Sequence, residues 1–279
     1  EETIMVVQHN LTAANTNRQL GITTNGLQKS TEKLSSGYKI NRAADDAAGL
    51  SISEKMRNQI RGLNKASDNA QDGISLVQTA EGALNEVHSM LQRMSELAVQ
   101  AANGTNATED RAALDAEVQQ LKTEINRVGS TTQFNKMGIL DGTFSAGTKK
   151  SLQVGANANQ TISIAISALK SVVGSSLTAG LKLQTATNAQ SAITTVQNSI
   201  QKLSTLRSKL GAVQNRLEHT VANLDNISEN TQSAESRIRD TDMAEEMVQY
   251  SKNNILQQAG QSMLAQANQA NQGVLSLLQ

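Results

Sequence analysis

The chain of 279 residues has no proline, no cysteine and no tryptophan, and only two tyrosines and two phenylalanines. Without proline it has no residue that breaks a helix outright. Without cysteine it has no disulfide, no thiolate metal ligand and no thiol nucleophile. Because aromatic side chains dominate most globular cores, their scarcity favours narrow helix–helix seams of Ala, Leu, Ile, Val and Met.

An excess of charge is also missing. The 25 basic residues balance 25 acidic ones, so the formal net charge is zero. This balance leaves no electrostatic footprint for nucleic acid or an anionic membrane, and neither is expected as a partner. No apolar run approaches the roughly 18 residues of a membrane helix, and no signal peptide is recognisable. Since Met5 reads like a natural start, residues 1–4 are expected to be an addition or an alternative start.

Both ends of the chain carry helical patterns. From about residue 6 to 36, leucines recur every seven residues, which keeps one seam facing a partner helix. Gly37 is predicted to end this helix. A last helix, from about 242 to 278, is poorer in large apolar groups and can pair with the first. The predicted seam consists of Leu20, Leu27, Leu34, Met263, Leu264, Val274, Leu277 and Leu278.

The strongest periodic signal runs from about residue 47 to 102. At 1.5 Å per residue this helix would be about 80 Å long, so its natural partner is another long helix. A matching stripe from about 189 to 227 supplies that partner, and the helix after a break at 103–106 is expected to lie antiparallel. The apolar stripe comprises Met56, Ile60, Leu63, Ala70, Ile74, Val77, Leu84, Val87, Leu91 and Met94.

The middle of the chain is rich in Gly, Ser, Thr and Asn. Leu152 and Val154, then Ile162, Ile164 and Ile166, alternate with small or polar residues around a turn-rich stretch, which predicts a β-hairpin. The predicted fold is therefore mainly α: a long antiparallel helical rod with paired N- and C-terminal coiled-coil helices and a small β-hairpin region in the middle.

Catalytic or metal chemistry finds little support. His9, His88 and His219 are far apart and lack metal-ligand spacing. Asp45 and Asp46 could form a paired-carboxylate site, but helix capping explains them better. No phosphate-binding loop and no Ser-His-Asp pattern is visible. We expect neither an enzyme nor a cofactor.

Several long segments resemble bacterial flagellin. At the N-terminal side these are LQKSTEKLSSGYKINRAADDAAGLSISEKMRNQIRGL at 27–63, QDGISLVQTAEGAL at 71–84 and LQRMSELAVQAANGT at 91–105. At the C-terminal side they are LGAVQNRLEHTVANL at 210–224, AESRIRDTDMAEEM at 234–247 and NNILQQAGQSMLAQANQ at 253–269, before the ending VLSLLQ. The resemblance leaves out only about 145–190, so the chain looks like a short member without variable outer domains.

The resemblance implies an inner-core coiled-coil domain at 1–46 with 238–279. It also implies a rod domain at 47–237, with the β-hairpin region at about 130–187. It further implies secretion through the flagellar type III apparatus and assembly of many copies into an extracellular filament for swimming. The implied partners are further copies of the chain, an export chaperone on about 240–279, and hook-associated and cap proteins.

The family also implies recognition by Toll-like receptor 5. Arg93, Leu97 and Gln100 are spaced by four and three, which predicts one shared helix face. Ser95 stands where many members carry Arg, and Leu121 where a basic residue can occur, so binding is expected to be retained but weaker. The matching positions, which can equally serve filament packing, are Leu91, Gln92, Arg93, Glu96, Leu97, Gln100 and Glu117.

Two other functions stay open at this point. A hook–filament junction protein shares the terminal patterns, although the match across both rod segments favours the filament subunit. An immune ligand or adhesin without a polymerising role is the alternative from another class. Seeded growth of long filaments would separate these readings.

Overall fold

The computed structural model describes residues 10–145, 147–174, 177 and 180–277, with the backbone alone for 270–277. Two compact units form: a terminal unit of residues 1–58 with 230–279, and a central unit of residues 59–229. The fold is mainly helical, with long antiparallel helices and a small strand region, so the predicted fold class is confirmed. The predicted domain boundaries at 46/47 and 237/238 stay a prediction.

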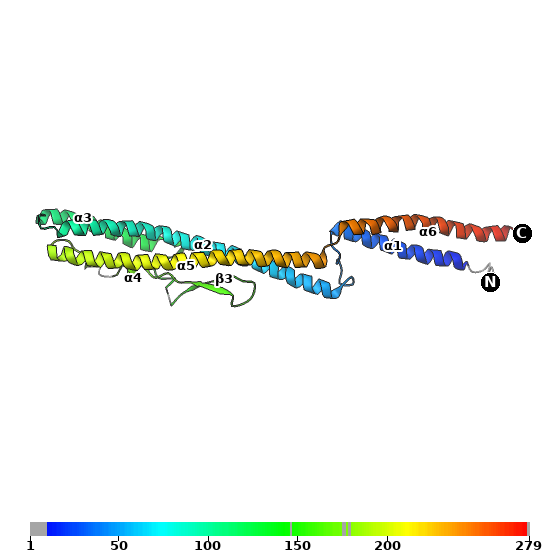
Figure 1. Cartoon of the computed structure of the whole chain (residues 1–279), viewed down its shortest axis with the longest axis horizontal. Coiled ribbons are helices and arrows are strands. Elements are labelled where there is room, and N and C mark those ends of the chain that lie inside the picture. The colour runs from blue at the N-terminus through cyan, green and yellow to red at the C-terminus, as the bar shows by residue number, and fades with distance from the viewer. Residues whose placement is uncertain (1–9, 146, 175–176, 178–179, 278–279) are drawn as a thin grey trace. The chain divides into compact units, whose positions relative to one another are not determined.

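Two long helices dominate the central unit: α2 (Ala47–Ala102) and α5 (Ala186–Arg239). They run antiparallel, because Ser67 donates to Asp225 (3.1 Å) while Arg207 reaches Glu81 (3.4 Å). Figure 1 shows them side by side. Buried positions of α2 alternate by three and four residues, which is a coiled-coil seam. The seam comprises Leu63, Ala66, Ala70, Gly73, Val77, Ala80, Leu84, Val87, Leu91, Met94, Ala98 and Ala101, and Ser67, Leu76 and Leu97 are buried beside it.

A third helix, α3 (Thr108–Thr131), turns back along α2. Arg111 closes the turn, since its Nε donates to the Ala101 carbonyl at 3.0 Å. Val118 and Ile125 are buried against the same core. The short α4 (Leu169–Val173) then packs near α5, where Ser199 Oγ donates to the Val173 carbonyl at 2.8 Å. Because Arg111 of α3 reaches Ala101 of α2 and Glu117 of α3 reaches Arg93 of α2, the predicted antiparallel arrangement of α2 and α3 is confirmed.

Two small antiparallel hairpins complete the central unit. β3 (Lys150–Gln153) pairs with β4 (Thr161–Ile164), as the alternating pattern predicted. β1 (Gln133–Phe134) pairs with β2 (Met137–Gly138), a hairpin that was not predicted from the sequence. The β3–β4 hairpin docks on α2 at two glycines, Gly62 and Gly73, which have no side chain to obstruct it. A Cβ added at Gly73 would lie 2.2 Å from Leu152 Cδ1, and one at Gly62 would lie 2.9 Å from Ala156 Cβ.

The terminal unit pairs α1 (Leu11–Ser36) with α6 (Met243–Leu277). Gly37 ends α1 in the left-handed conformation (φ 76°), as predicted. The chain then forms an isolated antiparallel bridge between Tyr38 and Asp240, and the Arg239 guanidinium lies 4.9 Å from the Tyr38 ring centre. This bridge holds the segment that follows α1 against the segment that precedes α6.

The two aspartates before α2 act locally. Asp46 accepts from the Gly49 amide at 2.9 Å and so caps α2, while Asp45 accepts from the amides of Asn41 and Arg42. The hydrogen bond from the Arg42 amide is the largest cause that holds the pKa of Asp45 below its usual value. Among the described helices, none combines the length and apolar character needed to cross a membrane.

Gly62 and Gly73 form a notch on α2 that receives the β3–β4 hairpin, and this notch yields a stability prediction. Gly62→Ala should destabilise the central unit by about 1–3 kcal/mol, because the new Cβ meets the Ala156 backbone (Cα at 3.3 Å) as well as its side chain. Gly82→Ala is the matched control: nothing lies within 4 Å of its added Cβ, so it should stabilise by about 0.5–1 kcal/mol. Urea unfolding of both variants provides the measurement. Equal effects would show that the hairpin does not need the notch.

Candidate interaction surfaces

The seam between α1 and α6 has an unusual composition. On α1 its half-buried or buried positions are Ala13, Thr16, Leu20, Thr23, Leu27, Ser30 and Leu34. On α6 they are Glu246, Tyr250, Asn253, Gln257, Gly260, Leu264 and Ala267. Both sets step by three and four residues, which is coiled-coil geometry. Most α6 members are polar or small, so this seam buries little large apolar surface.

Contacts along the seam recur every seventh residue of α6. Lys33 Nζ lies 3.5 Å from Glu246 Oε2, and Asn10 Nδ2 donates to the Ala267 carbonyl at 3.1 Å. Between them, a Cβ added at Gly26 would lie 3.2 Å from Asn253, and one at Gly260 would lie 3.2 Å from Leu20. Small residues thus let the two backbones approach closely, while polar groups interrupt the apolar contact.

Six other large apolar residues, in the described part of α6, lie elsewhere on the helix. Their exposed fractions range from 46% for Leu256 to 66% for Val248 and Ile255. Because these residues flank the seam on both sides and oppose it, α1 cannot cover them. Exposed apolar surface of this kind marks a site that another molecule can cover. We call this set the outer face of α6: Met243, Met247, Val248, Ile255, Leu256 and Met263.

The predicted seam residues divide between these two surfaces. Leu20, Leu27, Leu34 and Leu264 are half-buried between α1 and α6. Met263 is 58% exposed, so within one chain it belongs to the outer face rather than to the seam. The side chains of Val274 and Leu277, and residue 278 as a whole, lie outside the described residues. Val248 and Leu256 were not predicted as part of any surface. Both are apolar residues outside the heptad series 246, 253 and 260, and this position could have indicated a second apolar face.

The predicted recognition residues lie on α2 and α3 of the central unit. Arg93 bridges the helices: its Nε donates to Glu117 at 2.9 Å and its Nη1 to Glu96 at 3.2 Å. The hydrogen bonds to these carboxylates raise the pKa of Arg93, and the one to Glu117 is the largest cause, so the guanidinium stays charged. Gln92 lies 3.1 Å from His88. The result is an exposed, charged and amide-bearing face.

Two of the predicted recognition residues lie beneath that face. Leu91 and Leu97 have exposed fractions of 0% and 1% and belong to the α2 seam. Arg93 and Gln100 are exposed, so a spacing of four and three brought Leu97 near them without exposing it. A molecule docking here would contact Gln92, Arg93, Glu96, Gln100 and Glu117.

A shallow groove adjoins the same face. It is lined by Gln92, Ser95, Glu96, Val99 and Gln100 of α2 together with Ile200 of α5. Val99 is 56% exposed and Ile200 is half-buried, and neither was predicted as part of the surface. The signal for Val99 was available, because it is an apolar residue off the α2 stripe. Leu121, the other departure from the family pattern, is half-buried on α3.

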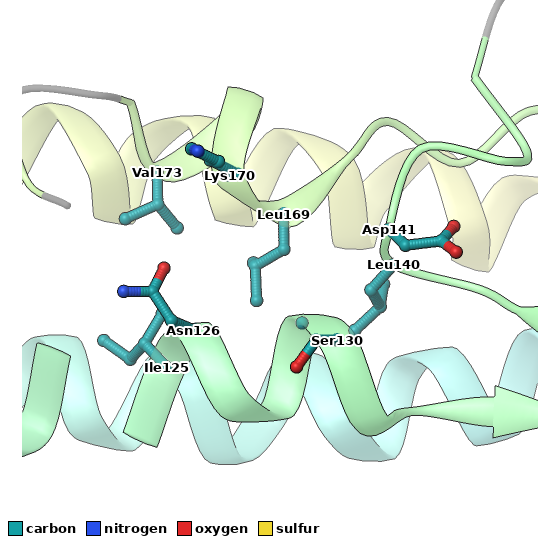
Figure 2. A pocket seen from close by; sticks show the side chains of 9 residues that line it. Ile125, Asn126, Ser130, Leu140, Asp141, Leu169, Lys170 and Val173 are labelled. Atoms are coloured by element: carbon teal, nitrogen blue, oxygen red, sulfur yellow. The ribbon is translucent and has the colours of Figure 1, made fainter. Parts of the chain in front are cut away.

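A half-open pocket of about 200 Å³ lies between α3 and α4. Figure 2 shows Ile125, Leu140 and Leu169 along it, with Asp141 and Lys170 at separate places on its edge. The hydrogen bond from Thr143 Oγ1 keeps the pKa of Asp141 low. Within the described part of the chain, no three His, Cys, Asp or Glu residues gather as a metal site would require. His9 lies outside that part.

Comparison with known proteins decides the family. The N-terminal helical region of bacterial flagellin matches residues 7–145, and the C-terminal helical region matches residues 193–278. The chain belongs to the bacterial flagellin family. It is 57% identical over 274 residues to the flagellin of Halalkalibacterium halodurans, which covers 98% of this chain and 100% of that protein. It is 49% identical to the flagellin of Bacillus subtilis, over 98% of this chain and 100% of that one.

Solved structures agree on the fold. The crystal structure of Bacillus cereus flagellin has a TM-score of 0.50 and 34% identity, and covers 56% of this chain and 88% of that one. A putative flagellar hook-associated protein from Vibrio parahaemolyticus has a TM-score of 0.57 over 70% of this chain and all of that one. At 12% identity, that second likeness concerns the fold alone. As a flagellin, the chain is a structural filament subunit that self-associates, and it is not an enzyme.

The polar seam predicts weak pairing of α1 and α6 in the isolated chain. No side chain among residues 243–269 of α6 is buried, whereas α2 has buried residues along 63–101. Amide hydrogens of α6 should therefore exchange at least about tenfold faster than those of residues 76–101. Hydrogen exchange of the unassembled chain, followed by mass spectrometry, measures both segments in one sample. Equal protection would mean that the seam alone stabilises α6.

Proposed function

We propose that the chain forms the extracellular flagellar filament used for swimming, and that the outer face of α6 is a contact between copies. The exposure of large apolar residues on α6, opposite a polar seam, carries this proposal. Water contact is unfavourable for such residues, and association would remove it. Leu20, Leu27, Leu34 and Leu264 would align α1 with α6, while Met263 would pack against other copies. Val274, Leu277 and Leu278 stay predicted members of the coiled-coil seam.

Folding of the terminal unit is then coupled to assembly. The seam is too polar to stabilise two helices strongly, so neighbouring copies supply the remaining apolar contact. A head-to-tail contact that does not close produces a filament rather than a ring. Before export, an export chaperone would cover α6, and hook-associated and cap proteins would present the growing end. A chain without disulfides suits passage through a type III apparatus.

Seeded growth with paired variants tests the copy–copy contact. Ile255→Gln should slow filament elongation about tenfold or more while leaving the central unit intact, because Ile255 is 66% exposed in one chain. Ile255→Leu keeps the apolar volume and should elongate like the unmodified chain. Elongation is followed by electron microscopy after adding short seeds. Normal growth of Ile255→Gln filaments would remove Ile255 from the contact.

The same experiment addresses the alternative of a hook–filament junction protein. A junction protein would bind seeds without extending them into long filaments, and an adhesin would not bind them. The family match over both helical regions supports the filament subunit. Long filaments of uniform diameter are therefore the expected result.

We also propose that Toll-like receptor 5 binds the exposed α2–α3 face. Support comes from the match of residues 91–105 to the family pattern and from the preformed Arg93–Glu117 bridge, which holds the guanidinium in place. Leu91 and Leu97 would support the face from below. Ser95 and Leu121 offer no charged group, so the interaction should be weaker than in members with basic residues there.

A binding assay with the receptor ectodomain tests this surface. Arg93→Ala should raise the Kd by about tenfold or more, since it removes a central guanidinium. Lys65→Ala is the matched control, because Lys65 forms an exposed pair with Asp68 on the same helix at 3.3 Å. The control should change the Kd less than about threefold. Equal effects of both variants, or no binding by the unmodified chain, would refute the proposal.

A further inference from the structure

The methionines of this chain are unevenly placed. Of eight in the sequence, Met243, Met247 and Met263 are 48%, 50% and 58% exposed on the outer face of α6. Met94, by contrast, is fully buried in the α2 seam, and Met137 in β2 is 37% exposed. Among the methionines that the structure describes, the three most exposed thus lie on the surface proposed to contact other copies.

Their arrangement puts sulfur on two sides of the helix. Met243 and Met247 are one helical turn apart, and Met263 follows Leu256 by two turns. All three side chains are exposed, whereas Glu246, which pairs with Lys33, is a half-buried member of the seam. A change at these sulfurs would therefore act mainly on the outer face.

We propose that Met243, Met247 and Met263 are oxidation sites at which hydrogen peroxide blocks filament assembly. The peroxide transfers one oxygen atom to the thioether: an S–O bond forms, the O–O bond breaks, and water leaves. Sulfur is oxidised by two electrons and the peroxide is reduced by two. The product sulfoxide is polar, which opposes burial of the residue against another copy.

The state of assembly decides which molecules react. In the free chain the three thioethers meet solvent, so peroxide reaches them. In a filament, the contact would cover them. Oxidation would then stop addition of new subunits without dismantling filaments already formed, and methionine sulfoxide reductase with a thiol would reverse it. This inference rests on the proposed filament contact of α6.

Peptide mapping by mass spectrometry tests the sites. After peroxide treatment of the free chain, Met243, Met247 and Met263 should be oxidised at least about tenfold faster than Met94. The same peptides from preformed filaments should show strong protection. Equal oxidation of Met94 and the α6 methionines, or no protection in filaments, would overturn the assignment.

Seeded elongation tests the consequence. Peroxide should slow elongation by the unmodified chain about tenfold, and reductase treatment should restore it. The triple variant Met243→Leu, Met247→Leu and Met263→Leu, compared with its own untreated elongation rate, should lose no more than about twofold after peroxide. Met137→Leu, which removes an exposed methionine outside α6, should stay as sensitive as the unmodified chain.

The outcomes separate this inference from the filament role. If the untreated chain does not extend seeds, the filament role fails and the inference falls with it. If the untreated chain extends seeds and peroxide has no effect, only the inference is overturned. A triple variant that remains peroxide-sensitive also overturns it, because the damage then lies at another residue.

Discussion

The central unit depends on a seam whose residues alternate by three and four along α2. Ala70, Ala80, Ala98 and Ala101 are all fully buried there, between larger aliphatic residues. In coiled-coil packing these positions fit between the residues of a facing helix, so α5 must run beside α2 over a long distance. Gly62 and Gly73 leave room on the surface of α2 for the β3–β4 hairpin. Few other arrangements would bury an apolar surface of this shape.

The terminal unit applies the same geometry with a different chemistry. Its seam positions include Glu246, Asn253 and Gln257, where the central unit has leucine, valine or alanine. Polar groups at such positions specify register and partner at the cost of stability. Lys33 facing Glu246 is one such register marker. The central unit therefore buries its apolar core within one chain, whereas under the proposed contact between copies the terminal unit would draw part of its stability from its neighbours.

Periodicity predicted most of the fold, because heptad spacing is a direct consequence of helix geometry. The spacing of Leu20, Leu27 and Leu34 indicated a pairing seam, and the alternation around Ile162 gave the hairpin. The pattern could not show which face of α6 meets α1, since Met263 and Leu264 are adjacent and only the three-dimensional register separates them. That register follows from small residues such as Gly260, which carry no hydrophobic signal.

The burial of recognition residues was unpredictable for a related reason. Leu97 lies four residues after Arg93, and that spacing places the two side chains next to each other around the helix, with Arg93 on the exposed face and Leu97 in the core. Position along the sequence gives the angle around a helix, but the position of α5 decides where solvent ends. Val99 and Ile200 illustrate the same limit, because a groove lined by two helices cannot be recognised from either sequence segment alone.

The pairing of α1 with α6 has a consequence for the order of events during synthesis. Asn10 donates to the carbonyl of Ala267, so two residues separated by 257 positions must meet. The ribosome makes the chain from its N-terminus, and α1 emerges long before its partner exists. The helix that completes α1 is thus made long after α1 itself. Until α6 emerges, α1 lacks the helix against which its seam packs.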